Sequence, residues 1–140
     1  MICTLCPRRC GAERTETDGH GFCAMPAQLR VARAALHLWE EPPISGTRGS
    51  GTVFFSGCTL RCVYCQNGSI SAGGFGKSVT TTRLRAIFQE LIDAGAHNIN
   101  LVTPTHFLPW ILPALDPPRP VPVVYNCGGY ESVDTLRLLE

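Results

Sequence analysis

Three cysteines, Cys58, Cys62 and Cys65, lie within eight residues and directly follow a short apolar run at residues 52–55. Cysteines this close cannot all pair as disulfides without strain, but their thiolates can converge on one soft metal centre. A closed structural zinc site needs four protein ligands, whereas an iron–sulfur cluster usually takes one thiolate per iron. Three thiolates on a 4Fe–4S cluster leave one iron open. The spacing therefore predicts a cluster with a vacant position for a small molecule.

A second group of cysteines, Cys3, Cys6, Cys10 and Cys23, precedes the first one. Two short spacings and one long loop fit a zinc knuckle or a second iron–sulfur cluster. Because all four ligands are present and no position is left open, a structural zinc staple is the favoured interpretation, although the spacing leaves the metal itself open. His20, in the long loop, is expected to be solvated.

The composition indicates a globular chain. One domain is the default count for 140 residues, and 44% hydrophobic against 16% charged residues excludes a disordered protein. The net charge of +1 provides no field that would recruit nucleic acid or a membrane surface. No long apolar stretch and no secretory h-region occur, so we expect a cytoplasmic protein. Seven of the eight cysteines are clustered, which favours metal over disulfides, and Cys127 is expected to be reduced and buried.

The pattern from residue 51 onward predicts an α/β protein in which strands and helices alternate. Predicted strands cover residues 52–56, 98–102 and 121–125, and predicted helices cover residues 80–94, 107–115 and those from 132 onward. The first of these helices carries apolar residues at helical spacing, namely Leu84, Ile87, Phe88, Leu91 and Ile92. Residues 29–39 fit either period and are interpreted as extended. Residues 40–46, with paired prolines, are predicted to be irregular.

Such an alternation implies a parallel sheet, and ligands bind beyond the carboxyl ends of its strands. Three polar segments follow the predicted strands: the loop at residues 58–65, residues 103–106 and residues 126–129. The order of the elements alone therefore predicts that these segments gather around the open iron.

The motif also carries a family resemblance. A C-x3-C-x2-C spacing with Tyr64 before the last cysteine and Gln66-Asn67 after it resembles the signature of the radical S-adenosylmethionine superfamily, in its pyruvate formate-lyase activating enzyme-like branch. The resemblance implies that residues 1–46 are a Cys-rich metal-binding N-terminal segment and linker. It implies that residues 47–140 are the first three βα units of a partial parallel barrel, truncated relative to the six units typical of that family.

The resemblance further implies an oxidoreductase-like radical enzyme. Cys58, Cys62 and Cys65 would hold a 4Fe–4S cluster whose open iron chelates S-adenosylmethionine. Reductive cleavage would then give a 5′-deoxyadenosyl radical that abstracts hydrogen from a substrate, as in an activase of glycyl-radical enzymes. The implied partners are S-adenosylmethionine, a flavodoxin- or ferredoxin-like electron donor and a protein substrate.

The implied cofactor-binding residues are Tyr64, Asn67, Thr103, Thr105, His106 and Asn126. Tyr64 would stack on adenine, or else pack against the preceding strand. The sequence Thr103-Pro104-Thr105-His106 replaces the Gly-Gly-Glu segment of many relatives, so the two threonines could be ordinary turn residues and His106 a helix cap or surface group.

A non-catalytic module is the alternative function. Zinc or an iron–sulfur centre would then serve structure or electron transfer. Zinc at Cys58, Cys62 and Cys65 would need a fourth ligand, for which Cys127 and His106 are the candidates.

Overall fold

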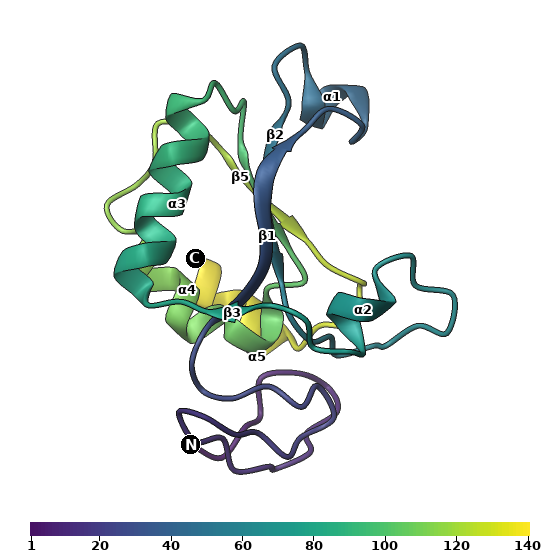
Figure 1. Cartoon of the computed structure of the whole chain (residues 1–140). Helices are drawn as coiled ribbons and strands as arrows, with labels where there is room; N and C mark the ends of the chain where they lie inside the picture. Colours follow the sequence, from purple (N-terminus) through teal and green to yellow (C-terminus); the bar gives the residue numbers. More distant parts are fainter.

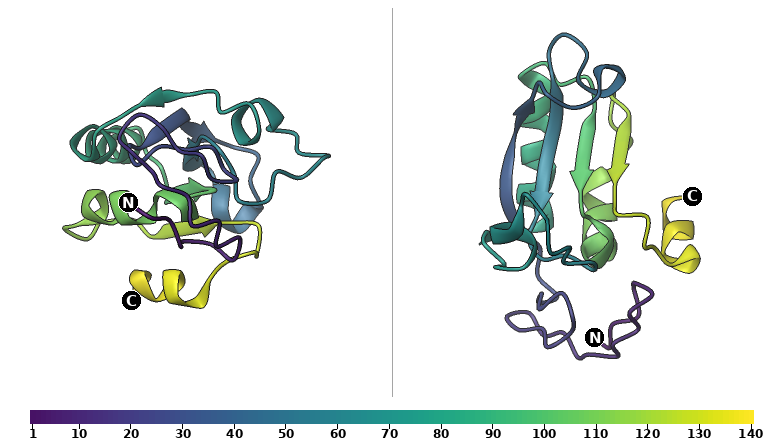
Figure 2. Two further views of the ribbon diagram at one scale, coloured as in Figure 1. Left: turned by 90° about the horizontal axis from the view of Figure 1, so that it is seen from below. Right: turned by 90° about the vertical axis from the view of Figure 1, so that its right-hand side faces the viewer.

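The computed structural model describes residues 1–140 and contains one five-stranded sheet in the order β3-β1-β2-β4-β5 (Figure 1). The elements in chain order are β1 (Arg30–His37), α1 (Pro42–Ser45), β2 (Ser50–Phe55), α2 (Gly68–Ser71), β3 (Lys77–Ser78), α3 (Thr81–Asp93), β4 (Ile99–Val102), the 3-10 turn η1 (Thr105–Phe107), α4 (Leu108–Leu115), β5 (Val123–Asn126), α5 (Val133–Leu136) and the 3-10 turn η2 (Arg137–Leu139). Helices α3 and α4 cover one face of the sheet. The other face carries short helices only near its ends (Figure 2). No helix combines the length and the apolar character needed to cross a membrane.

Three strands, β2, β4 and β5, run parallel, as the alternation predicted. Their register aligns Phe54, Val102 and Asn126 across the sheet, so the carboxyl ends of all three strands reach one edge. The extended interpretation of residues 29–39 is confirmed by β1, which pairs antiparallel with β2. The sheet is therefore mixed, and the predicted boundary after residue 46 falls between two neighbouring strands of one sheet.

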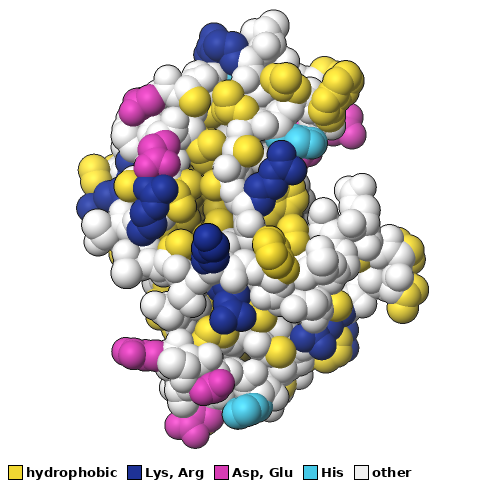
Figure 3. Space-filling view, viewed as in Figure 1, with side chains coloured by type: hydrophobic (Ala, Val, Ile, Leu, Met, Phe, Trp, Pro, Cys, Tyr) yellow, Lys and Arg dark blue, Asp and Glu magenta, His cyan; other side chains and the backbone are white.

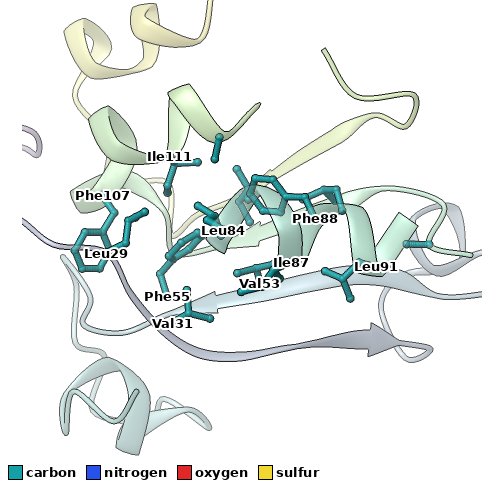
Figure 4. Close-up of a cluster of buried hydrophobic side chains, with 14 of the residues drawn as sticks. Leu29, Val31, Val53, Phe55, Leu84, Ile87, Phe88, Leu91, Phe107 and Ile111 are labelled. Carbon is teal, nitrogen blue, oxygen red and sulfur yellow. The ribbon is translucent and has the colours of Figure 1, made fainter. Parts of the chain in front are cut away.

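The core lies between the sheet and helices α3 and α4 (Figure 4). The Thr80 side chain caps α3 by accepting a hydrogen bond from the Arg83 N–H at 3.1 Å, which satisfies one of the free amides of the first turn. The predicted stripe of α3 is buried except for Ile92, which packs at its margin. Its buried members meet apolar side chains of β2, β4, η1 and α4, namely Val53, Phe55, Ile99, Leu101, Phe107 and Ile111.

The prediction that residues 40–46 are irregular is wrong for the middle of this segment, where Pro42 begins the single helical turn of α1. Proline is tolerated at the first helical position because that N–H has no helical partner. The Gly46 N–H closes the turn by donating to the Pro42 carbonyl at 3.0 Å. The turn is tied to the residue that precedes β4, because the Asn98 side chain donates to the Ile44 carbonyl at 2.7 Å.

The N-terminal 29 residues lie at the carboxyl edge of the parallel strands and contain no helix or strand (Figures 1 and 2). Arg14 fastens them to the rest of the chain. Its buried guanidinium donates to the carbonyls of Pro26 and His106 and lies over the rings of Phe107 and Trp110. A buried arginine is rare unless its donors are satisfied, so these bonds hold the segment in place.

Truncating Phe88 to alanine should lower the free energy of unfolding by about 3–5 kcal/mol, because it removes a fully buried ring from the core. Phe75→Ala, at a residue that is 66% exposed, is the matched control and should change the free energy by about 0.5 kcal/mol or less. Urea denaturation measures both values. Equal effects in the two variants would contradict the assigned core.

Candidate metal centre

The cysteine loop leaves the sheet at the end of β2, and two polar contacts fix its start. The Ser56 hydroxyl donates to the Phe75 carbonyl at 2.6 Å, and the His106 Nε2 lies 2.7 Å from the Ser56 carbonyl. Gly57 then turns the chain with a φ of +78°, in the left-handed region that glycine adopts without strain. The loop therefore departs from a rigid position at the carboxyl edge of the sheet.

The three polar segments that were predicted to converge do lie at this edge. The Thr103 N–H donates to the Asn126 carbonyl at 2.8 Å, which joins the ends of β4 and β5. Gly128 lies against the Leu60 side chain of the cysteine loop so closely that a Cβ at this position would clash with it. The segments after β2, β4 and β5 are thus in contact, as the parallel topology predicted.

The sulfurs of the loop have hydrogen-bond donors nearby. The Leu60 N–H donates to the Cys58 sulfur at 3.3 Å, and the Ser71 hydroxyl donates to the Cys65 sulfur at 3.5 Å. Cys58 and Cys65 are half-buried, whereas Cys62 is exposed at the outer turn of the loop. Hydrogen bonds to sulfur ligands are among the factors that set the reduction potential of an iron–sulfur cluster.

As the side chains stand, no three Cys, His, Asp or Glu residues are arranged to hold a single metal ion. One zinc ion would require all of its sulfurs about 2.3 Å from one point. A 4Fe–4S cluster instead takes each thiolate on a different iron, so its ligands are spread more widely. Three thiols in one short loop, two of them with hydrogen-bond donors to their sulfurs, are the kind of ligands that an iron–sulfur cluster uses. The candidate fourth zinc ligands do not complete a site with them.

A hollow of about 390 Å³ opens on the uncovered face of the sheet beside this loop (Figure 3). Its lining includes one residue from each parallel strand at the same register level: Phe54, Val102 and Asn126. Asn67, which follows the cysteine loop, and Arg33 of β1 also line it. The volume lies within the range of about 300–1,000 Å³ that is usual for small-molecule sites. Two predicted cofactor-binding residues, Asn67 and Asn126, therefore face one hollow.

Tyr64 and the two threonines have different surroundings. Tyr64 is 87% exposed, so its ring does not pack against the strand. Thr103 has a φ of +57°, which is uncommon for a β-branched residue. The buried Thr105 hydroxyl is already engaged by the Tyr125 hydroxyl and the Glu131 carboxylate. Burial raises the pKa of Tyr125 to about 12, so its hydroxyl stays protonated and bonded to Thr105. Cofactor contacts of these residues stay predictions.

His106 is neither a helix cap nor a surface group. Its side chain is buried, with Nε2 against the Ser56 carbonyl and with no partner for Nδ1. Burial lowers its pKa to about 4, so the imidazole is neutral and Nε2 carries the proton that the Ser56 carbonyl accepts. The sequence analysis named His106 as a cofactor-binding residue. In the structure its ring contacts the backbone at the start of the cysteine loop.

The N-terminal cysteines belong to the segment that lies at this edge of the sheet. Cys3 is buried, Cys6 and Cys23 are half-buried, and Cys10 is exposed. Burial raises the pKa of Cys6 and of Cys23, whereas hydrogen bonding from the Ala12 N–H lowers the pKa of Cys10.

Two single residues of the sequence analysis can also be placed. The expectation that Cys127 is buried is wrong, because it is exposed, whereas its thiol is free as expected. It follows the last residue of the edge strand β5, where no further element covers it. The prediction for His20 is confirmed, since this side chain is exposed.

Comparison with known protein families indicates which type of metal centre the cysteine loop belongs to. Residues 45–103, which run from the end of α1 through β4, match the family model described as a 4Fe-4S single cluster domain. The chain thus carries a 4Fe–4S domain that contains the whole cysteine loop. The predicted iron–sulfur chemistry is confirmed at this level.

A relative is known from an archaeon. The chain is 33% identical, over an alignment of 147 residues, to an uncharacterized protein of Methanocaldococcus jannaschii. The alignment covers 99% of this chain and 42% of that protein, so the chain spans less than half the length of the curated relative it matches. No solved structure matches the chain.

The burial of His106 predicts a pH dependence. Its pKa is about 4 in the folded chain against an ordinary 6.5, so between these values the unfolded chain binds a proton that the folded chain excludes. Stability from this residue is therefore complete above about pH 6.5 and falls by about 3 kcal/mol as the pH drops to about 4. Urea denaturation across this range should show a flatter pH dependence in His106→Gln. His20→Gln, at an exposed position, should keep the wild-type slope, and an unchanged slope in His106→Gln would contradict the assignment.

Proposed function

We propose that this chain is the cofactor-binding part of a radical S-adenosylmethionine protein. In this proposal, reductive cleavage of S-adenosylmethionine yields a 5′-deoxyadenosyl radical that abstracts hydrogen from a substrate. The observation that supports it most is the position of the hollow. It lies beside the cysteine loop, at the edge where the three parallel strands end, and it has the size of a small-molecule site.

The cysteine loop would hold the cluster. Cys58, Cys62 and Cys65 would each contribute one thiolate, and Leu60 and Ser71 donate hydrogen bonds to the sulfurs of Cys58 and Cys65. When bound, a 4Fe–4S cluster supplies one-electron reduction and one iron that is free to bind a ligand. The His106 contact to Ser56 keeps the start of the loop in place beside the hollow.

The lining of the hollow suits a molecule with both polar and apolar parts. Phe54 and Val102 provide an apolar floor, which excludes water from a bound ligand. The side-chain amides of Asn67 and Asn126 can donate to a carboxylate or bond a ribose. Arg33 adds a positive charge that favours an anionic group. The exposed ring of Tyr64 is free to stack on adenine.

The partners belong to the same proposal. Reduction of the cluster needs an electron donor of the flavodoxin or ferredoxin type. The hydrogen atom would come from a substrate, such as a glycine residue of a protein that then carries the glycyl radical. The outer turn of the cysteine loop, with Cys62, Val63 and Tyr64, is exposed and therefore accessible to such a partner.

The same exposure favours the second candidate, a non-catalytic iron–sulfur module for electron transfer. A cluster held at an exposed turn can exchange electrons with a docked protein without binding any substrate. The two functions differ in one property, which is the response of the cluster to S-adenosylmethionine.

Anaerobic reconstitution with iron and sulfide separates these functions. The radical enzyme predicts that the EPR signal of the reduced cluster changes when S-adenosylmethionine is added, and that 5′-deoxyadenosine forms with reductant. Cys62→Ser should abolish both effects, because one of the three ligands is lost, whereas Cys127→Ser should retain them. An intact cluster whose signal is indifferent to S-adenosylmethionine would overturn the proposal in favour of the electron-transfer module.

Filling the hollow tests its role separately from cluster binding. Val102→Trp places an indole among the lining residues, so the affinity for S-adenosylmethionine should fall at least about tenfold, or about 1.4 kcal/mol, while the iron content stays unchanged. Val133→Trp, at an exposed position at the start of α5, is the matched control. Equilibrium dialysis of the reconstituted proteins measures the affinities. Equal affinity in both variants would place the binding site elsewhere.

A further inference from the structure

Two arginines and two aromatic residues stack alternately beside the cysteine loop. The Arg8 guanidinium is 3.9 Å from the centre of the Phe22 ring and 5.4 Å from the centre of the Tyr130 ring. The Arg61 guanidinium is 5.4 Å from the centre of the same Phe22 ring. Each distance lies within the range of a cation–π contact. The stack therefore joins the N-terminal segment, the cysteine loop and the segment that follows β5.

The stack is attached to the cysteine loop at two points. Arg61 directly precedes Cys62 in the chain, and the Arg8 Nε donates to the Thr59 carbonyl at 3.0 Å. Cys62 and the two residues after it are exposed. Both guanidinium groups are therefore held beside the exposed turn of the loop.

No carboxylate of the chain neutralises these two arginines. The ion pairs join other residues, namely His37 with Glu40, Arg83 with Glu90 and Arg137 with Asp134. The only side-chain hydrogen bond of Arg8 is the one to Thr59, and the Nε of Arg61 is buried without a partner. Two positive charges on one ring repel each other, so an anionic group placed against them would be attracted by both.

The sequence around the loop also lacks acidic residues. Between Glu41 and Glu90 the chain contains four arginines and one lysine but no aspartate or glutamate. This range includes the whole cysteine loop, α2 and β3. The small net charge of the chain is therefore an average, and the part that carries the cysteine loop is positive.

We propose that an arginine–aromatic surface, formed by Arg8, Phe22, Arg61 and Tyr130 with the exposed turn of the cysteine loop, docks the acidic surface of a protein that delivers electrons to the cluster. Arginine and aromatic side chains are enriched at protein interfaces, and the arginine fork matches a carboxylate. Two guanidinium groups are few for a nucleic acid, whose binding uses many phosphate contacts. The proposal rests on the 4Fe–4S centre of the loop, but it does not require S-adenosylmethionine binding.

The rate at which a reduced acidic flavodoxin reduces the reconstituted full chain tests the proposal. Electrostatic steering raises association rates about 10- to 1,000-fold and weakens with salt, so replacing Arg8 and Arg61 together by Gln should slow reduction about tenfold at low salt. Added salt should slow the wild type as well. Arg9→Gln, at an exposed residue beside Ser132 and Asp134, is the matched control and should keep the wild-type rate. Equal rates in all three proteins would overturn the proposal.

A charge series at Arg61 separates docking from packing. Arg61→Lys keeps the positive charge, Arg61→Gln removes it and Arg61→Glu reverses it, so the rate of reduction by flavodoxin should fall in this order. Photoreduction with 5-deazariboflavin, which is uncharged, should proceed equally in all of these variants. A rate with flavodoxin that is as low in Arg61→Lys as in Arg61→Gln would mean that the ring contact matters rather than the charge, which would contradict the proposal.

Equilibrium binding of oxidised flavodoxin to the reconstituted chain measures docking without electron transfer. The affinity should fall with added salt and in the double Gln variant. Tighter binding of single-stranded RNA or of phosphatidylserine vesicles at the same arginines would assign the surface to another anionic partner and overturn the proposal. A cluster that accepts electrons from flavodoxin but ignores S-adenosylmethionine would support the docking surface while contradicting the radical enzyme.

Discussion

The parallel pairing of β2, β4 and β5 is the constraint on which the candidate centre depends. Parallel strands need crossover connections, and their carboxyl ends reach the same edge of the sheet. The register of Phe54, Val102 and Asn126 places one residue of each strand side by side in the hollow. The order and direction of the strands alone therefore place the cysteine loop beside the hollow.

The N-terminal segment, residues 1–29, lies against this edge of the sheet (Figure 1). Arg14 joins this segment to the backbone at His106, and the His106 ring in turn contacts Ser56 at the start of the cysteine loop. Arg8 adds a second connection at Thr59. The N-terminal segment is therefore joined to the cysteine loop by hydrogen bonds that are buried at Arg14 and His106 and part-buried at Arg8. Buried donors and acceptors are costly to leave unpaired.

The sequence was sufficient for the features that depend on local pattern. The apolar stripe of α3, the three parallel strands and the three-cysteine loop all have a period or a spacing that can be counted. The pairing of β1, the helical turn at Pro42 and the burial of His106 depend on contacts between residues distant in the chain. Exposure of Cys127 follows from its position after an edge strand, and the order of strands is a property of the whole sheet.

Mössbauer spectroscopy of the iron-reconstituted chain tests the central claim most directly. If Cys58, Cys62 and Cys65 hold a 4Fe–4S cluster beside the hollow, one iron of the four lacks a protein ligand, and only its signal should shift when S-adenosylmethionine is added. A spectrum in which none of the four irons responds would mean that no iron of the cluster binds S-adenosylmethionine. That result would contradict the account.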